Sequence, residues 1–551
     1  MSAHVVTDAT ATAQGSRPDQ PVAPGAGHSI ARNTAIFSVA TGLSRVAGLV
    51  REIVAARYFG TSGPASAFTI AFQVPNLVRG LFADAALSAA FVPVFTELLE
   101  QNRRREAASL AASLLFVIVA GLGAISALFI LGAGVIMPLF TGDKFSPELV
   151  DLTVGLSRVL FPIVVLLGVN GLVVGILNAN GHFAIPAIAP LVWNFVIIVG
   201  LVALRPLFPP GDKIYAYAVG VLVGTVIQLA LSIWALGRIH FRLRLRVDLR
   251  DPRLKRVFML MLPVTIGLGV INVDLLINSS LGTLVSDSAP RAIDAAFRIY
   301  MLPQGMFSVA VATVLFPALS RFVARHDVDG LRATCATGTR QIFLLLIPSA
   351  AITLALAEPI TRLVYQRGAF GPHSTMETAS ALFWFSFSLP FAGVNLLLTR
   401  TFFSLQRPWI PTALAGANLV INAALSLALY RPLGIPGLVI GTAAASAGMT
   451  IGQWWYLRRA LGGRLEGRQT LAVTAAICSA SGALGVTAYA VWWLLDAIAG
   501  RGFLGQLVSV GGGIAAGVAV FVAIVRWMRI PEFDQIERLF VGQLRLLRRA
   551  D

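Results

Sequence analysis

Long apolar stretches, bounded by Gly, Pro and clusters of charged residues, follow one another along most of this chain. A helix needs about 20 apolar residues to cross the hydrocarbon core of a bilayer. Most of the stretches reach that length, so they predict transmembrane helices. The fourteen expected spans lie near residues 31–56, 66–98, 107–139, 148–178, 184–204, 214–236, 257–284, 290–322, 336–364, 375–404, 409–430, 435–457, 469–496 and 503–527.

Composition supports the assignment to the membrane. The chain has 551 residues, of which 56% are hydrophobic and 13% are charged, and its mean hydropathy is +0.78. A soluble domain usually has about 25% charged residues, so the sequence predicts an all-α polytopic membrane protein. The formal net charge of +17 could suggest nucleic acid as a partner. However, the basic residues lie mainly in short loops between spans, which is typical of the positive-inside pattern and excludes that interpretation.

The loops also predict the topology. Lys and Arg are more frequent in loops after even-numbered spans, so we expect both termini on the cytoplasmic side of the membrane. Residues 1–28 have the composition of a disordered tail and lack the apolar core of a signal peptide, so the first span is expected to be an uncleaved anchor. Residues 531–551 predict an amphipathic helix that lies on anionic membrane lipids or serves as a short partner-binding tail.

An internal duplication divides the spans into two sets. Residues 168–172, Gly-Val-Asn-Gly-Leu, recur at 393–397 as Gly-Val-Asn-Leu-Leu, an offset of about 225 residues. Six spans per copy is an even number, so both copies have the same orientation, as in transporters that bind substrate between parallel halves. The expected units are an N-lobe at 29–240, a C-lobe at 241–462 and two additional spans within 463–530.

Charged residues occur inside the first two expected spans, where they are expensive. They are Arg45, Arg51, Glu52, Arg79 and Asp84. A charge near the centre of a membrane helix costs roughly 2.5–3.5 kcal/mol, so these side chains should face a hydrated cavity and not lipid. Three of them are arginines, whose planar guanidinium groups suit carboxylate or phosphate. The pattern indicates a cationic cavity for an anionic substrate.

A fourth arginine in the second repeat extends this prediction. Arg298 precedes Pro303-Gln304-Gly305 in the eighth span, much as Arg79 follows Pro75-Asn76 in the second, so each lobe places an arginine beside a helix break. We expect Arg51, Arg79 and Arg298 to converge on a diphosphate. The alternative is that each arginine forms a structural ion pair, such as Arg51 with Glu52 or Arg298 with Asp294.

Glu52 is the candidate for a gate. A carboxylate on the first span could pair with arginines of the other lobe in one conformation and release them in another. Asp84 and Asp294 are expected to be counter-charges or partners of such a gate and not substrate contacts.

The C-lobe contains a second set of polar residues at membrane depth. They are Asp274 in the seventh span, Asn418 and Asn422 in the eleventh, and Thr442 in the twelfth. Oxygen ligands of this kind suit a small hard cation such as Na⁺, and Asp274 could instead carry a proton. Hydrogen bonding between helices is the simpler alternative.

No enzyme site emerges from the sequence. The six histidines are scattered without metal-ligand spacing, and no Gly-rich phosphate loop followed by Lys is present. The two cysteines, Cys335 and Cys478, provide neither a disulfide framework nor a metal site. We therefore expect a transporter with no cofactor beyond a coupling ion.

Several motifs together resemble a known family. The segments that carry the resemblance are Leu43 to Gly48, Val50 to Glu52, Pro75 to Arg79, Phe82 to Pro93, Phe297-Arg298 and Val314 to Pro317. They are similar to the MurJ (MviN) lipid II flippases of the multidrug/oligosaccharidyl-lipid/polysaccharide exporter superfamily. The resemblance covers residues 30–527 and implies a fourteen-helix flippase. Such a protein moves the undecaprenyl-diphosphate-linked peptidoglycan precursor from the inner to the outer leaflet for cell wall synthesis.

The resemblance also implies roles for individual residues. The substrate-binding arginines of the family match Arg45, Arg51, Arg79 and Arg298, and the gate positions match Ser44, Glu52 and Asp84. Glu52 stands where the family often has Asp, and the charged residues expected near Ser66 and Gln73 are missing. The sodium site of some members resembles Asp274, Asn418, Asn422 and Thr442, but an Asp of that set is replaced here by Asn422. The last two spans would form a groove for the polyprenyl tail.

Three other functions stay open from the sequence. A cation-coupled multidrug exporter of the same superfamily is the first, although its cationic substrates would be repelled by arginines. A flippase for another polyprenyl-linked glycan is the second. The third is a scaffold for envelope synthesis proteins without transport activity. The energy source, whether Na⁺, H⁺ or membrane potential, is not specified by the sequence.

Overall fold

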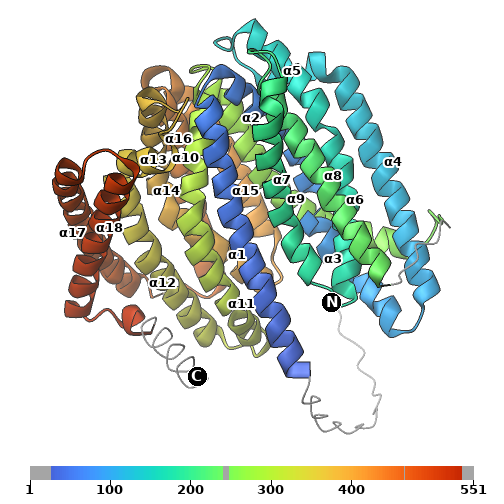
Figure 1. The fold of residues 1–551 in the computed structure, drawn as a ribbon. Helices are drawn as coiled ribbons and strands as arrows, with labels where there is room; N and C mark the ends of the chain where they lie inside the picture. The colour runs from blue at the N-terminus through green and yellow to red at the C-terminus, as the bar shows by residue number, and fades with distance from the viewer. Residues whose placement is uncertain (1–25, 83, 240–246, 464–465, 536–551) are drawn as a thin grey trace, which may run out of the picture.

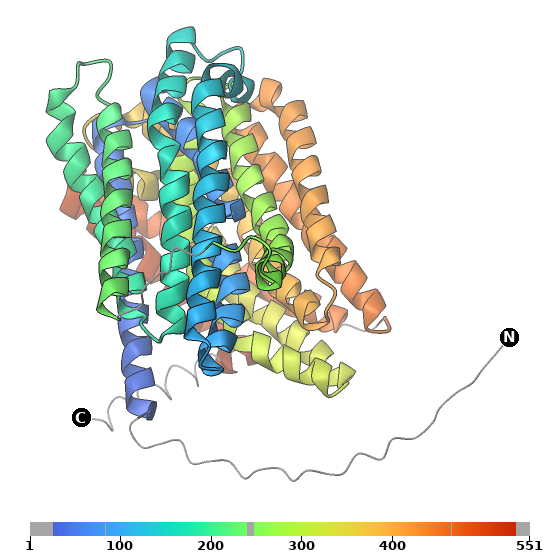
Figure 2. The same cartoon turned by 90° about the vertical axis from the view of Figure 1, so that its right-hand side faces the viewer.

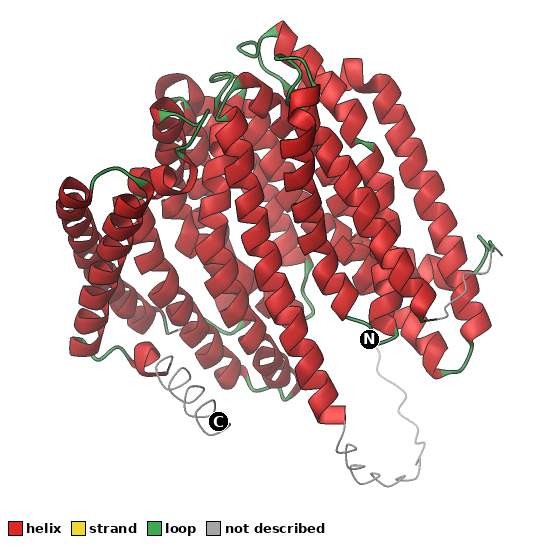
Figure 3. Ribbon diagram, viewed as in Figure 1, coloured by secondary structure: helices red, strands yellow, loops and turns green. Residues whose placement is uncertain are grey.

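The computed structural model describes residues 26–82, 84–239, 247–463 and 466–535. These residues form a bundle of long, roughly parallel helices joined by short loops (Figures 1 and 2). Figure 3 shows helices and loops throughout the described part of the chain. The N-lobe helices are α1 (Ala26–Phe59), α2 (Gly63–Phe82), α3 (Asp84–Glu100), α4 (Arg104–Ile136), α5 (Pro147–Leu160), α6 (Pro162–Ala179), α7 (Ala184–Leu204) and α8 (Tyr215–Arg238).

The second half repeats this organisation and adds a hairpin. Its helices are α9 (Pro252–Gly282), α10 (Ala289–Pro303), α11 (Val309–Ala324), α12 (Val328–Ala355), α13 (Ala357–Tyr365), α14 (Pro372–Ser404), α15 (Trp409–Leu433), α16 (Ile435–Ala460), α17 (Gly467–Ala499) and α18 (Phe503–Trp527). Two short 3₁₀ helices, Met137–Phe140 and Arg205–Leu207, follow α4 and α7.

The helices correspond in order to the fourteen expected spans, so the predicted all-α polytopic fold is confirmed. Four spans are divided: α2 with α3, α5 with α6, α10 with α11, and α12 with α13. Eleven spans of the described chain are long and apolar enough to cross a membrane. The other three expected spans correspond to α1, to α2 with α3, and to α9. Each of them contains at least one charged residue that the sequence predicts to belong to a site, which lowers its mean hydropathy.

Two of the divisions have clear local causes. Pro162 has no backbone N–H, so it starts α6 directly after α5 ends at Leu160. Pro303 ends α10, and the five residues Gln304–Ser308 continue as a π-helix before α11 begins. A π segment widens a helix locally and often lies at a functional site.

The hydrophobic core has three parts. One lies within α1–α8 together with residues of α9, a second joins α10–α16 with Ala56 of α1, and a third joins α12 to α17 and α18. In α9, Leu254, Val257, Met261 and Leu276 belong to the first core although the sequence assigned this helix to the C-lobe. The division at residue 240 thus stays a prediction, because α9 packs along both halves.

Corresponding asparagines of the repeat make corresponding contacts. Asn170 in α6 accepts a hydrogen bond of 2.8 Å from Ser232 in α8, and Asn395 in α14 accepts one of 2.9 Å from Thr450 in α16. Hydrogen bonds of this type hold neighbouring helices together where water is absent. The repeated asparagine therefore serves packing in each half.

A buried ion cluster fastens the hairpin of α17 and α18 to the rest of the bundle. Arg340 of α12 donates to Glu466 (2.7 Å) at the start of α17 and to Glu532 just after α18. Arg340 and Glu532 are almost fully buried. At the other end of the hairpin, Arg362 of α13 pairs with Asp496 of α17 at 3.0 Å.

The two terminal predictions fall largely outside the described residues. Residues 1–25, most of the predicted disordered tail, are among these, and α1 begins at Ala26. Of the predicted amphipathic segment 531–551, only residues 531–535 are described, and they are helical. The start of α1 and the end of α18 lie at the same end of the bundle, the lower end in Figure 1.

Candidate functional site

A cavity of about 860 Å³ lies between the two halves, bordered by α1, α2, α6, α7 and α10. Its volume is in the upper part of the usual range for small-ligand pockets, about 300–1,000 Å³. Seven charged residues of the described part of the chain line it: Arg45, Arg51, Glu52, Arg79, Arg291, Asp294 and Arg298. Five arginines therefore face two carboxylates, which leaves the cavity wall with a formal excess of three positive charges.

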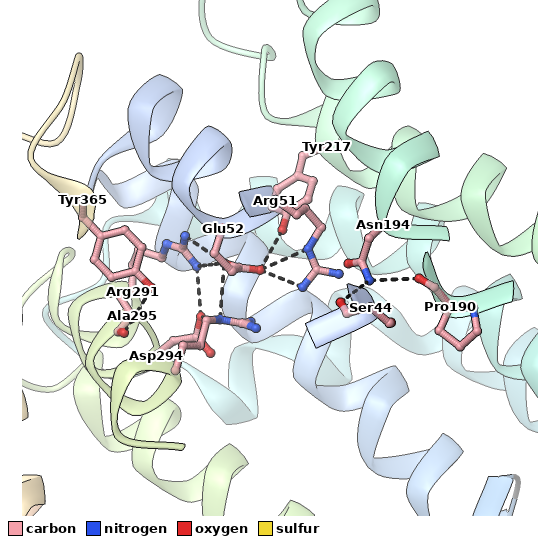
Figure 4. A network of polar contacts seen from close by, with 11 residues as sticks. Ser44, Arg51, Glu52, Pro190, Asn194, Tyr217, Arg291, Asp294, Ala295 and Tyr365 are labelled. Atoms are coloured by element: carbon pink, nitrogen blue, oxygen red, sulfur yellow. Dashed lines mark hydrogen bonds and ion pairs between the residues drawn. The ribbon is translucent and has the colours of Figure 1, made fainter. Parts of the chain in front are cut away.

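Glu52 of α1 is the centre of the ionic network (Figure 4). Its side chain is only 2% exposed. Arg51 donates to Oε1 of Glu52 from Nε and Nη2, at 3.2 and 2.7 Å, and the hydroxyl of Tyr217 in α8 donates to the same oxygen at 3.2 Å. The guanidinium of Arg51 also lies over the ring of Trp193 in α7, 4.9 Å from its centroid. The neighbouring residues Arg51 and Glu52 are thus both held by N-lobe side chains.

The second carboxylate oxygen of Glu52 faces the C-lobe. Arg291 of α10 donates to Oε2 from Nη1 and Nη2, both at 3.1 Å, and Nε of Arg298 lies 3.3 Å from it. Asp294 shares the same two arginines, accepting 2.9 Å from Arg291 and 3.0 Å from Arg298. A single carboxylate of the first helix therefore bridges the two lobes through arginines.

The other two cavity arginines lie on α1 and α2. Arg79 of α2 donates from Nε to the amide oxygen of Asn76 at 3.0 Å. Arg45 of α1 is exposed and makes no hydrogen bond or ion pair with the described residues. Its side chain reaches the π segment, where Nη1 is 3.5 Å from the position that a Cβ atom at Gly305 would take.

Neutral polar groups and apolar side chains form the rest of the wall. Gln73, Asn76, Asn170 and Gln228 contribute amides, all from the N-lobe. The side-chain oxygen of Gln73 is buried without a partner among the described residues. These amides can donate to and accept from an uncharged polar guest beside the arginines.

At the end of the bundle where α1 ends, the two halves are in tight contact. Gly60 and Gly368 have φ angles of +56° and +60°, and a side chain on either would collide with backbone of the opposite lobe. Only glycine permits this approach, and the N–H of Ala369 donates to the carbonyl of Arg57 at 2.8 Å beside it. The hydroxyls of Thr61 and Ser374 are also bonded, at 2.7 Å. The two lobes therefore close against each other at this end of the bundle.

The structure brings the predicted arginines together. Arg45, Arg51, Arg79 and Arg298 line one cavity, while the structural pairs Arg51 with Glu52 and Arg298 with Asp294 are formed as well. The structural ion pairs are therefore present at the shared cavity, and convergence of the arginines on a diphosphate stays a prediction. Ser44 contributes its carbonyl, which accepts 3.4 Å from Asn194 of α7. The side chain of Asp84 lies outside the described residues.

Sequence reasoning missed Arg291. Its side chain is 5% exposed and reaches Glu52 with two donors, more than any other C-lobe residue does. The signal was present, because Arg291, Asp294 and Arg298 are three and then four residues apart and so share one face of a helix. Arg291 stands at the start of the expected span, where a basic residue is usually interpreted as lying at the membrane interface.

The predicted ion-site residues lie on three adjacent helices. Asn422 of α15 donates to Asp274 of α9 at 2.7 Å, and Thr442 of α16 donates to Asn422 at 3.3 Å. Asn278 of α9, which the sequence did not assign to the set, joins them. Asn418, one turn earlier on α15, makes no hydrogen bond with the described residues.

Comparison with known proteins decides the family. A family model described as lipid II flippase MurJ matches residues 55–511. The chain belongs to the MurJ family. Sequence relatives agree with this membership: a lipid II flippase MurJ of Burkholderia cenocepacia is 31% identical over 403 residues, covering 72% of this chain and 78% of the relative. A probable lipid II flippase MurJ of Treponema pallidum is 30% identical over 443 residues, covering 78% and 82%.

Solved structures support the fold of this MurJ-family protein. A structure described as lipid II flippase MurJ in an inward closed conformation superposes with a TM-score of 0.73 at 23% identity, covering 90% of this chain and all of the other. An inward-facing multidrug transporter of the MATE family superposes with a TM-score of 0.65 at 15% identity, covering 77% and 94%. The chain therefore has the fold of these two solved structures.

Proposed function

We propose that this protein is a lipid II flippase of the bacterial plasma membrane. It moves the undecaprenyl-diphosphate-linked peptidoglycan precursor from the cytoplasmic to the outer leaflet by alternating access, and so supplies cell wall synthesis. Membership of the MurJ family supports the substrate, and the names of the relatives in Burkholderia and Treponema agree with it.

The observation that carries this proposal is the excess of positive charge in the cavity. Among the described residues, five arginines and two carboxylates line the cavity, so its wall has more positive than negative groups. A diphosphate supplies the complementary charge and accepts bidentate hydrogen bonds from arginine forks. The neutral amides on the N-lobe wall would contact the sugar and peptide part of the same headgroup. A cationic drug would instead be repelled, so the MATE-like fold does not favour multidrug export.

Glu52 competes with the substrate in the proposed mechanism. In this conformation it holds Arg51, Arg291 and Arg298, whereas Arg45 makes no ion pair with the described residues. An entering diphosphate would meet Arg45 and Arg79 first and would then take over the arginines bound to Glu52. Because Glu52 joins the lobes through Arg291 and Arg298, loss of those pairs would weaken the contact between the lobes.

The orientation follows from the loops. Placing the basic loops and both termini in the cytoplasm makes the close contact at Gly60 and Gly368 the outer gate. The headgroup would therefore enter from the cytoplasmic side in this conformation. After outward opening, Glu52 would reclaim the arginines and assist release. The membrane potential favours outward movement of an anionic headgroup by about 2.3 kcal/mol per charge per 100 mV.

The polyprenyl tail requires a separate apolar path, because it cannot cross with the headgroup in a polar chamber. The hairpin of α17 and α18 supports that role, since Val486, Trp493 and Leu504 expose apolar surface. Its ion pairs with α12 and α13 would keep this surface attached to the C-lobe during the transport cycle.

Depletion of the protein in cells tests this proposal. Lipid II should accumulate in the inner leaflet. Accumulation of a different polyprenyl-linked glycan would identify that glycan as the substrate in place of lipid II. Complementation with Arg79→Ala or Arg298→Ala should fail although the variants are inserted at normal levels. A scaffold would tolerate both changes. Arg400→Ala is the matched control, because Arg400 lies in a membrane helix but donates to Thr313 outside the cavity.

A further inference from the structure

The polar cluster between α9, α15 and α16 is organised around one amide. Asn422 is completely buried. Its amide nitrogen donates to Oδ1 of Asp274 at 2.7 Å and to Oδ1 of Asn278 at 3.1 Å. Its amide oxygen accepts from Ser426 at 3.1 Å and from Thr442 at 3.3 Å. An asparagine side chain has two N–H donors and one oxygen with two lone pairs, so both donors of Asn422 are used. Ser426 has a single hydroxyl hydrogen, which it shares between Asn422 and the carbonyl of Leu438.

The neighbours of Asn422 fix its orientation. Turning the amide over would place its carbonyl oxygen against the Asp274 carboxylate, where two acceptors would face each other without a proton between them. In addition, Asn278 donates to Thr442 at 3.2 Å, which closes a ring of hydrogen bonds from Asn422 to Asn278, from Asn278 to Thr442 and back to Asn422. In this ring the nitrogen of Asn422 faces Asn278, and the same nitrogen contacts Asp274.

This donor set does not fit a sodium ion. A cation bound here would need the oxygens of Asp274 and Asn278 as ligands, but the N–H groups of Asn422 already lie against both. The oxygens of Asn422 and Thr442 are likewise engaged within the ring, and Asn418 stands outside it.

We propose that the amide of Asn422 replaces the coupling cation, so that this protein holds α9, α15 and α16 together without Na⁺. The N–H groups of Asn422 carry partial positive charge and stabilise the Asp274 carboxylate, which would otherwise need a bound cation. The family resemblance implies an acid at position 422. With an acid there, two carboxylates would face each other at the 2.7 Å separation now seen between Asn422 and Asp274, and a cation would be required between them.

Thermal unfolding of the full-length purified protein tests the proposal without any transport measurement. The melting temperature is compared in NaCl and in choline chloride at equal ionic strength. We expect no Na⁺-specific change for the wild-type protein. Asn422→Asp should melt lower than wild type in choline chloride and gain at least about 2 °C when Na⁺ replaces choline, because ligand binding to the folded state raises its stability.

A matched control separates a new cation site from the general effect of an added acid. Asn395→Asp places a carboxylate at another buried asparagine of the same lobe, away from Asp274, and should show no Na⁺-specific shift. A Na⁺-specific rise in the melting temperature of the wild type that Asp274→Asn abolishes would overturn the proposal. A folded Asn422→Asp protein that ignores Na⁺ would overturn it as well.

If Asn422→Asp does not fold, direct binding of radioactive ²²Na⁺ to the wild-type protein decides the question. Binding at the background level of Asp274→Asn supports the proposal, and saturable binding above that level contradicts it. None of these results depends on whether the protein flips lipid II.

Discussion

Two arginine clusters in this molecule use the same pairing of guanidinium and carboxylate in opposite ways. Around Glu52, three arginines share two acids at the edge of an 860 Å³ cavity that two further arginines also line. Around Arg340, a single arginine lies between Glu466 and Glu532, packed between helix ends. The first cluster has more cationic than anionic groups and lies beside open volume. The second has one arginine for two carboxylates, so it has no excess positive charge. The presence of ion pairs therefore does not separate a binding site from a structural bridge, but the balance of charge beside open volume does.

The largest effect is expected in the second cluster. Arg340→Met leaves Glu532 buried without a cation, and removing one partner of a buried ion pair costs about 3–5 kcal/mol. The purified variant should unfold at a clearly lower temperature, and its transport should fall only as far as the amount of folded protein falls. The double variant Arg340→Met with Glu532→Gln should recover part of the stability. An unchanged unfolding temperature would remove the contrast between the clusters.

Arg298→Ala should affect transport and leave the fold intact. Asp294 and Glu52 both keep Arg291 as a partner, so no acid is left unpaired. We expect the rate of lipid II flipping in proteoliposomes to fall about 100-fold, which corresponds to about 2.7 kcal/mol. A loss of folded protein like that of Arg340→Met would show that Arg298 is a structural bridge instead.

Arg298→Lys should have a smaller effect on the same rate, about tenfold. Lysine keeps the positive charge but cannot form the bidentate contact that a planar guanidinium makes with phosphate. If the variant is as inactive as Arg298→Ala, charge alone contributes little at this position. A wild-type rate would mean that the fork geometry is not used.

The smallest effect on stability and transport is expected for an ion pair that is exposed to solvent. Arg256 and Glu97 are 3.0 Å apart, with side chains that are 57% and 49% exposed. Such pairs contribute about 0–1 kcal/mol, so Glu97→Ala should change neither the unfolding temperature by more than about 2 °C nor the flipping rate. A loss of flipping would place function outside the cavity.

The sequence predicted the number and order of the spans because the length of an apolar run has a direct physical meaning in a membrane. It also predicted that Arg45, Arg51, Arg79 and Arg298 lie at one cavity, since charge inside an apolar span must avoid lipid. It raised the pairing of Glu52 with arginines of the other lobe, but it could not predict which arginines share this carboxylate. Such sharing depends on how close the lobes lie in one conformation.

Other features were hidden by distance along the chain. Arg340 and Glu532 are far apart in sequence, so no local pattern joins them. The ring around Asn422 could be predicted only if the rotations of α9, α15 and α16 about their own axes were known. Ser426 and Asn278 could be recognised as members only once Asn422 was placed between them.

Binding of lipid II to Glu52→Gln in detergent solution tests the central claim that the substrate and Glu52 compete for the same arginines. Gln is similar in size but carries no charge, so Arg51, Arg291 and Arg298 become available to the diphosphate. We predict about tenfold tighter binding than in the wild type, together with slower flipping because release is impaired. Binding that is unchanged or weaker in a folded Glu52→Gln protein would contradict the account.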